Sequence, residues 1–220
     1  MGTTFTRDEL QGLPAKLLRN GHLFNAVVTL VTGPDGRLWT VKDFSSRPWY
    51  VRLIARLLLS HELSILKRLK GIDGVAEDAF RIDANSMAIL FQEGDILANI
   101  DPKRMTPEYL TRLEELTRAI HRAGVVHLDM RSFSNILIRT DGTPGVIDFQ
   151  AAQTTWWMPE FLRKRLEDID MSGAYKKWER FQPAAMGEER KRELVRINKL
   201  RDLWVIRGYF GTHVKKEKRS

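Results

Sequence analysis

The stretch VVHLDMRSFSNILIRTDGTPGVIDFQ, residues 125–150, contains two short apolar runs separated by the turn-rich segment TDGTPG, residues 140–145. This pattern predicts a β-hairpin. The residue before the first strand of a hairpin and the residue after its second strand lie at the same end of the hairpin. We therefore expect Asn135 and Asp148 to be neighbours, with Asp129 on the loop that leads into the first strand.

The expected strands of this hairpin are Ile136–Ile138 and Val146–Ile147. Two carboxylates and a carboxamide at one end of it would supply hard oxygen ligands, which suit Mg²⁺. Asp and Asn also occur in turns for purely local reasons. Because an apolar strand leads into and out of the cluster, we favour a metal site at which Asp129, Asn135 and Asp148 converge.

The order of the expected elements divides the chain into a β-rich first part with one helix and a mainly helical second part. The segment GPDG, residues 33–36, indicates a tight turn between two β-rich runs. Leucines at spacings of i, i+4 and i+7 give the helix that follows one apolar stripe. The expected elements are strands at 26–31, 37–44 and 87–91, and helices over 52–69, over 106–124 and within 159–204.

Two charged residues fall at positions that these patterns predict to be apolar. Lys42 shares a strand face with Leu38 and Phe44. Glu62 lies on or beside the apolar stripe of the first long helix. An unpaired buried charge costs several kcal/mol, so Lys42 and Glu62 should contact each other or a bound anion. The alternative is that Glu62 is solvated at the edge of the stripe and that the ammonium of Lys42 reaches out to water.

The composition excludes several classes of protein. The 220 residues include no cysteine, which excludes disulfide scaffolds and thiolate metal sites. We find no leader pattern and no apolar run of about 18 residues, so we expect a cytoplasmic protein. The formal net charge of +8 favours a polyanionic partner such as nucleic acid, a phosphorylated glycan, a nucleotide or an acidic membrane face. No motif strongly indicates nucleic acid.

These residues resemble the signature of a protein-kinase-like fold. Lys42 resembles the strand lysine of that fold, and Glu62, twenty positions later, resembles its helix glutamate. HLD at 127–129 resembles the catalytic loop, and DFQ at 148–150 resembles the metal-binding Asp-Phe-Gly. Within the superfamily, the string VVHLDMRSFSNILI…GVIDF is most similar to the bacterial lipopolysaccharide kinase group, the Kdo and heptose kinases. RIO-type atypical kinases are near relatives.

The resemblance implies an α+β, two-lobed fold. It places a small β-rich N-lobe with one helix, the nucleotide-binding part, over residues 1–92. A mainly helical C-lobe, with the catalytic loop, the metal site and the acceptor site, is expected over residues 93–220.

The resemblance also implies a nucleotide site for ATP. Lys42, oriented by Glu62, would hold the α- and β-phosphates. The adenine would lie against the link after the strand at 87–91, where backbone groups of Phe91, Gln92 and Glu93 would read its edge.

The implied catalytic group surrounds the transferred phosphoryl group. Asn135 and Asp148 would hold Mg²⁺, and Asp129 would orient the acceptor hydroxyl and accept its proton. Arg131 would offset negative charge on the γ-phosphate.

Three departures from the kinase pattern bear on function. The segment NGHLFNA, residues 20–26, has one glycine where a glycine-rich phosphate loop is usual. Five residues separate Asp129 from Asn135 where four are usual. Only nine residues separate Phe149 from Pro159, too few for a long regulated segment or a broad peptide shelf.

Three functions therefore stay open. The first is an ATP-dependent kinase acting on a hydroxyl of a lipopolysaccharide core sugar or a related anionic glycan, with contact to an acidic inner-membrane face as a further expectation. The second is a RIO-like serine/threonine protein kinase, and the third is a nucleotide-binding pseudokinase scaffold. The presence of Lys42, Glu62, Asp129, Asn135 and Asp148 together argues against the third.

Overall fold

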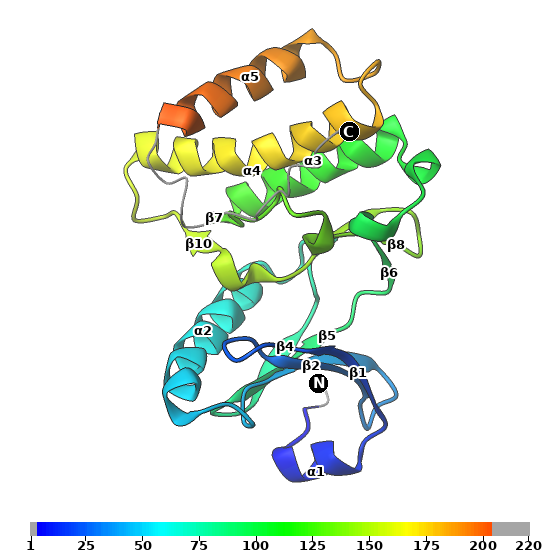
Figure 1. Ribbon diagram of the computed structural model, residues 1–220, viewed down its shortest axis with the longest axis vertical. Helices are drawn as coiled ribbons and strands as arrows, with labels where there is room; N and C mark the ends of the chain where they lie inside the picture. The colour runs from blue at the N-terminus through cyan, green and yellow to red at the C-terminus, as the bar shows by residue number, and fades with distance from the viewer. Residues whose placement is uncertain (1–3, 204–220) are drawn as a thin grey trace, which may run out of the picture.

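A computed structural model describes residues 4–203, which form a β-rich lobe and a helical lobe joined by a narrow connection (Figure 1). The predicted α+β architecture in two parts is confirmed. Positions 204–220 of the predicted second lobe lie outside the described residues. The first lobe is built on an antiparallel five-stranded sheet in the order β1-β2-β3-β5-β4. Its strands are β1 Ala15–Asn20, β2 Val27–Thr32, β3 Leu38–Asp43, β4 Ala79–Asp83 and β5 Ser86–Leu90.

One long helix, α2 Trp49–Arg68, covers one face of this sheet (Figure 1). It begins three residues before the predicted start at Arg52. Its apolar stripe is buried, with Leu59, Leu63 and Leu66 in the main core of the protein. Burial of each such side chain contributes about 1.5–3 kcal/mol, so the stripe fixes which face of α2 meets the sheet.

The opposite face of the sheet is covered by a short helix that the sequence patterns did not predict, α1 Arg7–Gly12. Phe5, just before the helix, packs edge-on against Trp39 of β3 and Phe80 of β4. All three belong to a second, smaller core. The β-rich lobe therefore contains two helices where the sequence predicted one.

Arg7 connects this N-terminal segment to the ends of two strands. Its guanidinium donates to Asp43 at 2.6 Å and to Asp83 at 2.6 Å, and a further hydrogen bond reaches the Ser86 hydroxyl at 2.9 Å. Asp43 directly follows Lys42, so this cluster steadies the end of β3 that carries the predicted phosphate-binding lysine.

The connection between the lobes runs through residues 91–93 into β6 Gly94–Ile96. β6 pairs with β8 Ile136–Arg139, which pairs in turn with β9 Pro144–Val146. The predicted hairpin is therefore present, although its second strand begins two residues and ends one residue earlier than expected. Two short 3-10 helices, Leu97–Asn99 and Pro102–Arg104, follow β6.

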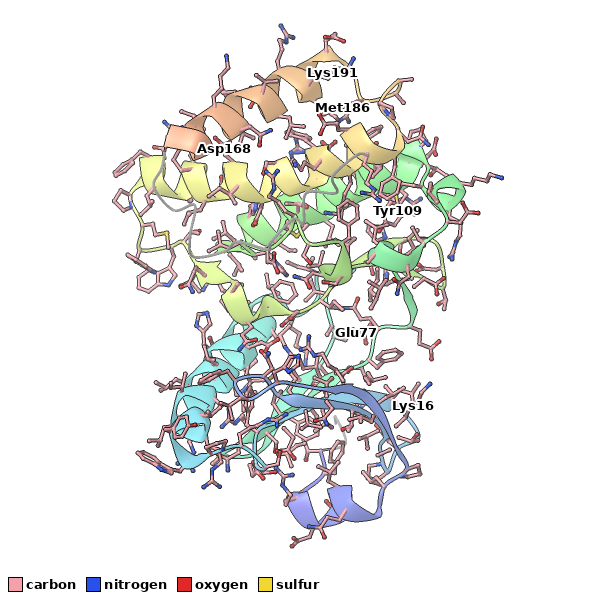
Figure 2. The ribbon with its side chains drawn as sticks, viewed as in Figure 1. Lys16, Glu77, Tyr109, Asp168, Met186 and Lys191 are labelled. Atoms are coloured by element: carbon pink, nitrogen blue, oxygen red, sulfur yellow. The ribbon has the colours of Figure 1, made fainter. Side chains whose placement is uncertain are left out.

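The second lobe is dominated by three helices (Figure 1). Thr106 caps the first of them through a hydrogen bond to the Tyr109 amide. Tyr109 (Figure 2) also donates its hydroxyl to the Leu137 carbonyl at 2.8 Å and so ties that helix to the hairpin. Among residues 4–203, no helix is long and apolar enough to cross a bilayer. The elements are α3 Pro107–Arg122, β7 Val125–Val126, the 3-10 helices Phe133–Asn135 and Phe149–Ala151, β10 Gln153–Thr154, α4 Glu160–Phe181 and α5 Glu188–Leu203.

Candidate active site

Lys42 lies at the centre of a partly buried ionic triangle between the two lobes. Its ammonium donates to both carboxylate oxygens of Glu62, at 2.6 and 2.9 Å, and to Oδ1 of Asp148 at 2.8 Å. The Glu62 side chain is only 2% exposed. The triangle thus joins strand β3, helix α2 and the second residue after β9, which lie far apart in the sequence.

The charges in this triangle stabilise one another. Burial by itself would lower the pKa of Lys42, but the carboxylates of Glu62 and Asp148 outweigh burial and raise that pKa above its ordinary value. Burial would likewise raise the pKa of Asp148, yet the ammonium of Lys42 outweighs it and lowers that pKa. Lys42 therefore remains a cation and Asp148 an anion at neutral pH.

The end of the hairpin brings Asn135, Asp148 and Asp129 into one cluster. The Ile147 amide donates to the Asn135 carbonyl at 3.0 Å, so Asn135 lies opposite the residue that precedes Asp148. The Asn135 side-chain amide donates to Oδ2 of Asp129 at 2.7 Å. Despite the extra residue in the loop, Asn135 therefore meets Asp129, at the end of a 3-10 turn.

The two carboxylates of the cluster differ in proton affinity. Partial burial raises the pKa of Asp129, although the hydrogen bond from Asn135 opposes the rise. The pKa of Asp148 is lowered, as described above. Neighbouring carboxylates whose pKa values are shifted in opposite directions commonly have different chemical roles. Here Asp129 is suited to accept a proton, and Asp148 is suited to bind a cation.

Asn135 and Asp148 fit a magnesium ion that also binds phosphate. Mg²⁺ is commonly held by one or two protein oxygens together with substrate phosphates and water. Oδ1 of Asp148 is engaged by Lys42. Within residues 4–203, no group of three His, Asp or Glu side chains is placed to hold a metal by itself. The site thus suits a metal that enters with a nucleotide.

Asp148 of the cluster and Leu128, the neighbour of Asp129, have an unusual backbone. Among the described residues, Leu128 and Asp148 are the only non-glycine residues with positive φ, at 64° and 63°. A bulky residue in this region costs roughly 1–2 kcal/mol, and such strain is concentrated at functional sites. The surrounding structure must therefore hold this loop in place.

Asp170, on α4, holds the strained loop. One of its carboxylate oxygens accepts the His127 amide at 2.6 Å and the other accepts the Leu128 amide at 2.7 Å. His121 of α3 lies 3.1 Å from the same carboxylate, which is 1% exposed. The residues that follow also approach the loop closely, because a Cβ on Gly173 would lie 2.6 Å from the Met130 carbonyl carbon. The sequence patterns did not identify Asp170.

Comparison with solved structures agrees with this fold. The structure of the Rio2 kinase–ADP/Mg²⁺–phosphoaspartate complex from Chaetomium thermophilum matches with a TM-score of 0.59 and 14% sequence identity, over 89% of this chain and 73% of that chain. The chain has a protein-kinase-like fold. No protein-family model matches the chain, and no curated sequence matches it.

In the kinase-like frame, residues 91–93 occupy the link between the lobes. The Phe91 amide already has a hydrogen-bond partner, because it donates to the Leu38 carbonyl at 2.9 Å. Gln92 donates through its side chain to the Val146 carbonyl at 3.2 Å, and Glu93 is exposed. The Phe91 amide therefore cannot read an adenine edge in this structure, which leaves the Phe91 carbonyl and the backbone of Gln92 and Glu93.

The segment that replaces the glycine-rich loop is held by an arginine. Arg47 donates to the Gly21 carbonyl at 2.7 Å and to the Asn25 carbonyl at 3.0 Å. A side chain at position 21 would collide with the Ala26 carbonyl at 2.3 Å, which explains the single glycine. The loop is thus short and braced.

Arg19 adds a cation beside this loop that sequence reasoning missed. It lines a small hollow together with Lys42 and Glu62. Its charge contributes to the lowered pKa of Asp148. A second cation near Lys42 can offset the smaller number of loop amides available for phosphate.

Arg131 is directed toward the C-terminal helices. Its guanidinium donates to the Ser172 hydroxyl of α4 at 2.9 Å and to the Asn198 side chain of α5 at 3.3 Å. These two hydrogen bonds connect the loop at 127–135 to the helices α4 and α5 rather than to the triangle around Lys42.

Lys177 of α4 lies completely buried beneath the catalytic loop. Its ammonium donates to the Met130 and Gly173 carbonyls and lies 4.9 Å above the Phe133 ring. Burial lowers the pKa of Lys177 to about 7; the charge of Arg131 adds to this effect and that of Asp129 opposes it.

We expect Lys177 to make stability depend on pH. Its pKa is about 7 in the folded protein and 10.5 ordinarily, so the unfolded chain binds the extra proton between these values. The unfolding free energy of the wild type minus that of Lys177→Met should therefore rise from about pH 7 to pH 10, by up to about 1.4 kcal/mol per pH unit. Denaturant titrations of both proteins across this range measure it, and a difference that stays flat would contradict a proton lost on folding.

Proposed function

We propose that this chain is an atypical kinase that transfers the γ-phosphoryl group of ATP to a hydroxyl group of an acceptor, with Mg²⁺ as cofactor. The observation that carries this proposal is the triangle of Lys42, Glu62 and Asp148, with Asp129 and Asn135 beside it. The match to a Rio2 kinase that binds ADP and Mg²⁺ supports the same class of reaction.

Phosphoryl transfer requires positioning and charge compensation more than covalent chemistry. Mg²⁺, when bound, supplies positive charge next to the phosphates. Lys42 is suited to the α- and β-phosphates because Glu62 fixes its ammonium in the site. Asp148 and Asn135 provide the oxygen atoms toward which a metal–nucleotide complex would be drawn.

Asp129 is the group suited to act on the acceptor. It lies on the strained loop, is exposed to solvent and is oriented by the Asn135 amide. Its raised pKa makes it a better proton acceptor than an ordinary aspartate. We assign it the role of orienting the acceptor hydroxyl and taking its proton.

A protein acceptor, as for a RIO-like kinase, is our first candidate because of the structural match. A specific observation keeps a glycan acceptor as the second candidate. Between Asp148 and α4 the chain forms only a 3-10 turn, the two-residue strand β10 and a short loop. This segment offers little surface for a peptide. A lipopolysaccharide core sugar and contact with an acidic membrane face belong to this second candidate.

The Lys42→Met variant tests the nucleotide site. Removal of the ammonium should weaken ATP binding at least tenfold, which corresponds to about 1.4 kcal/mol. Titration calorimetry of ATP with Mg²⁺ measures this change. Lys16→Met, on the exposed edge strand β1 of the same sheet (Figure 2), is the matched control and should bind ATP like the wild type.

Loss of Lys42 leaves the buried Glu62 unpaired, which costs about 3–5 kcal/mol of stability. The double variant Lys42→Met/Glu62→Gln removes that charge and should recover stability without recovering ATP affinity. If either variant binds ATP as tightly as the Lys16→Met control, the nucleotide site has been misassigned. ATP binding by the wild type without transfer to sugar, glycolipid or protein acceptors would favour the pseudokinase.

A further inference from the structure

A hollow of about 680 Å³ lies where the end of α2 meets the helical lobe, and none of the nucleotide-site residues lines it. It is bounded by the last turns of α2 and α3, by the loop after β10 and by the first half of α4. Its basic residues outnumber its acidic ones. The cations are Arg68, Arg118, Arg122, Arg163 and Lys164, and the carboxylates are Glu167 and Asp168.

Both carboxylates are already engaged. Glu167 lies 3.9 Å from Arg163, one helical turn earlier. Asp168, which lies on the side of α4 that faces α5 (Figure 2), pairs with Arg196 of α5 at 3.0 Å. Neither carboxylate therefore neutralises the cations contributed by α2 and α3.

Three of the five cations have no carboxylate partner among the described side chains, although Arg68 donates to the Ala123 carbonyl at 2.6 Å. Arg118 pairs with Glu114 at 3.2 Å, as Arg163 does with Glu167. Among the residues whose side chains are described, Arg68, Arg122 and Lys164 form no ion pair. Like charges around one concave surface repel each other and raise the local potential. An anion in the hollow would relieve this repulsion.

Helix stability explains only part of this charge. Cations are favourable at the C-terminal end of a helix, where Arg68 and Arg122 lie. Arg163 and Lys164, by contrast, lie near the N-terminal end of α4, where the helix dipole disfavours cations. Pro159 at the N-cap offers no side-chain acceptor to that end. An anionic ligand accounts for cations in this place.

The rim of the hollow carries an exposed indole. Trp156, in the loop after β10, is 73% exposed. An indole face packs well on the apolar face of a sugar ring or beside the glycerol of a lipid headgroup. Guanidinium groups bind phosphate oxygens through paired hydrogen bonds. Together these groups suit a phosphate attached to a small polyol.

We propose that this hollow is a binding site for a phosphate-bearing polyol, the chemistry shared by sugar phosphates and phospholipid headgroups. The site is separate from the nucleotide site, since Lys42, Asp129 and Asp148 do not line it. The proposal does not depend on the proposed kinase activity, because binding here requires neither ATP nor transfer.

The test uses the double variant Arg122→Gln/Lys164→Gln of the full chain. Glucose 6-phosphate, titrated by calorimetry, should bind the wild type saturably and should bind this variant at least tenfold more weakly. The control is Lys103→Gln/Arg112→Gln, which removes the same charge from exposed positions outside the hollow. The control should bind within about twofold of the wild type, and Lys42→Met should also retain binding.

A second arm identifies the source of the phosphate. Sedimentation with phosphatidylcholine vesicles that contain phosphatidic acid reports binding to a lipid headgroup. If the wild type binds the vesicles but not glucose 6-phosphate, and only the hollow variant loses vesicle binding, the site is supported and its ligand is a lipid headgroup. If the wild type binds glucose 6-phosphate but not the vesicles, and only the hollow variant loses that binding, the ligand is a soluble sugar phosphate.

Equal losses in the hollow variant and in the control would show a general charge effect and overturn the proposal. Wild-type protein that binds neither probe would overturn it as well. Thermal unfolding of each variant distinguishes lost binding from lost folding. If the hollow variant is unfolded, Arg122→Lys/Lys164→Arg, which retains both charges, must preserve binding for the proposal to stand.

Discussion

The Asp129→Asn variant should transfer phosphate about 10² to 10⁴ times more slowly than the wild type. The substitution keeps the size of the side chain but removes its ability to take a proton. The raised pKa of Asp129 and its hydrogen bond from Asn135 are the features that suit it to this task. Single-turnover assays at saturating ATP, with the acceptor found by screening, measure the rate of this step.

Nucleotide affinity separates a catalytic role for Asp129 from a structural one. Asp129→Asn should bind ATP with Mg²⁺ as the wild type does, because Asp129 does not contact Lys42. If Asp129→Asn transfers phosphate as fast as the wild type, Asp129 is not the base.

Asp148→Asn, in contrast, should shift the Mg²⁺ dependence of ATP binding, since it removes a carboxylate from the triangle.

Asp170→Asn should slow transfer about 10²-fold, the effect expected when a catalytic group is misplaced by about 1 Å. Asp170 accepts a backbone amide with each of its carboxylate oxygens. An asparagine presents one oxygen and one NH₂ group, so either the His127 or the Leu128 amide would lose its acceptor. An unsatisfied buried donor costs about 1–3 kcal/mol, and the strained backbone at Leu128 would relax.

Asp168→Asn is the matched control, because Asp168 lies on the same helix but pairs with Arg196 of α5 (Figure 2). Asp170→Asn should lower kcat with little change in ATP affinity, and it should increase amide exchange at Leu128. The control should do neither. Equal kcat values in the two variants would show that Asp170 has no influence on the loop.

The proximity of Lys42 and Glu62 could be predicted because the strand periodicity and the helix periodicity each place a charge at an apolar position. A lysine on an apolar strand face and a glutamate on an apolar helix stripe both require a buried partner. In the structure, Nζ of Lys42 lies 2.6 Å from Oε1 of Glu62. The closeness of Asn135 to the residue before Asp148 was predictable from hairpin geometry alone. These parts of the site depend on local periodicity, which a single sequence displays.

Other parts depend on contacts that have no local pattern. Asp170 lies within a helix rich in charged residues, and only its burial against the catalytic loop distinguishes it from its neighbours. The hydrogen bonds of Arg131 to Ser172 and Asn198 were not predictable, because its position in the loop does not determine which way its side chain turns. Strand β1 was missed because all six of its residues are exposed, so it shows no apolar alternation.

The Arg7 cluster has a consequence for the order of events during synthesis. Arg7 leaves the ribosome 76 residues ahead of its partner Asp83. At roughly 5–20 residues per second, the N-terminal segment spends about 4 to 15 seconds without its partner. Phe5 is likewise synthesised well before Phe80, the ring that it packs against. The first described residues to leave the ribosome are thus among the last of the β-rich lobe to reach their native contacts.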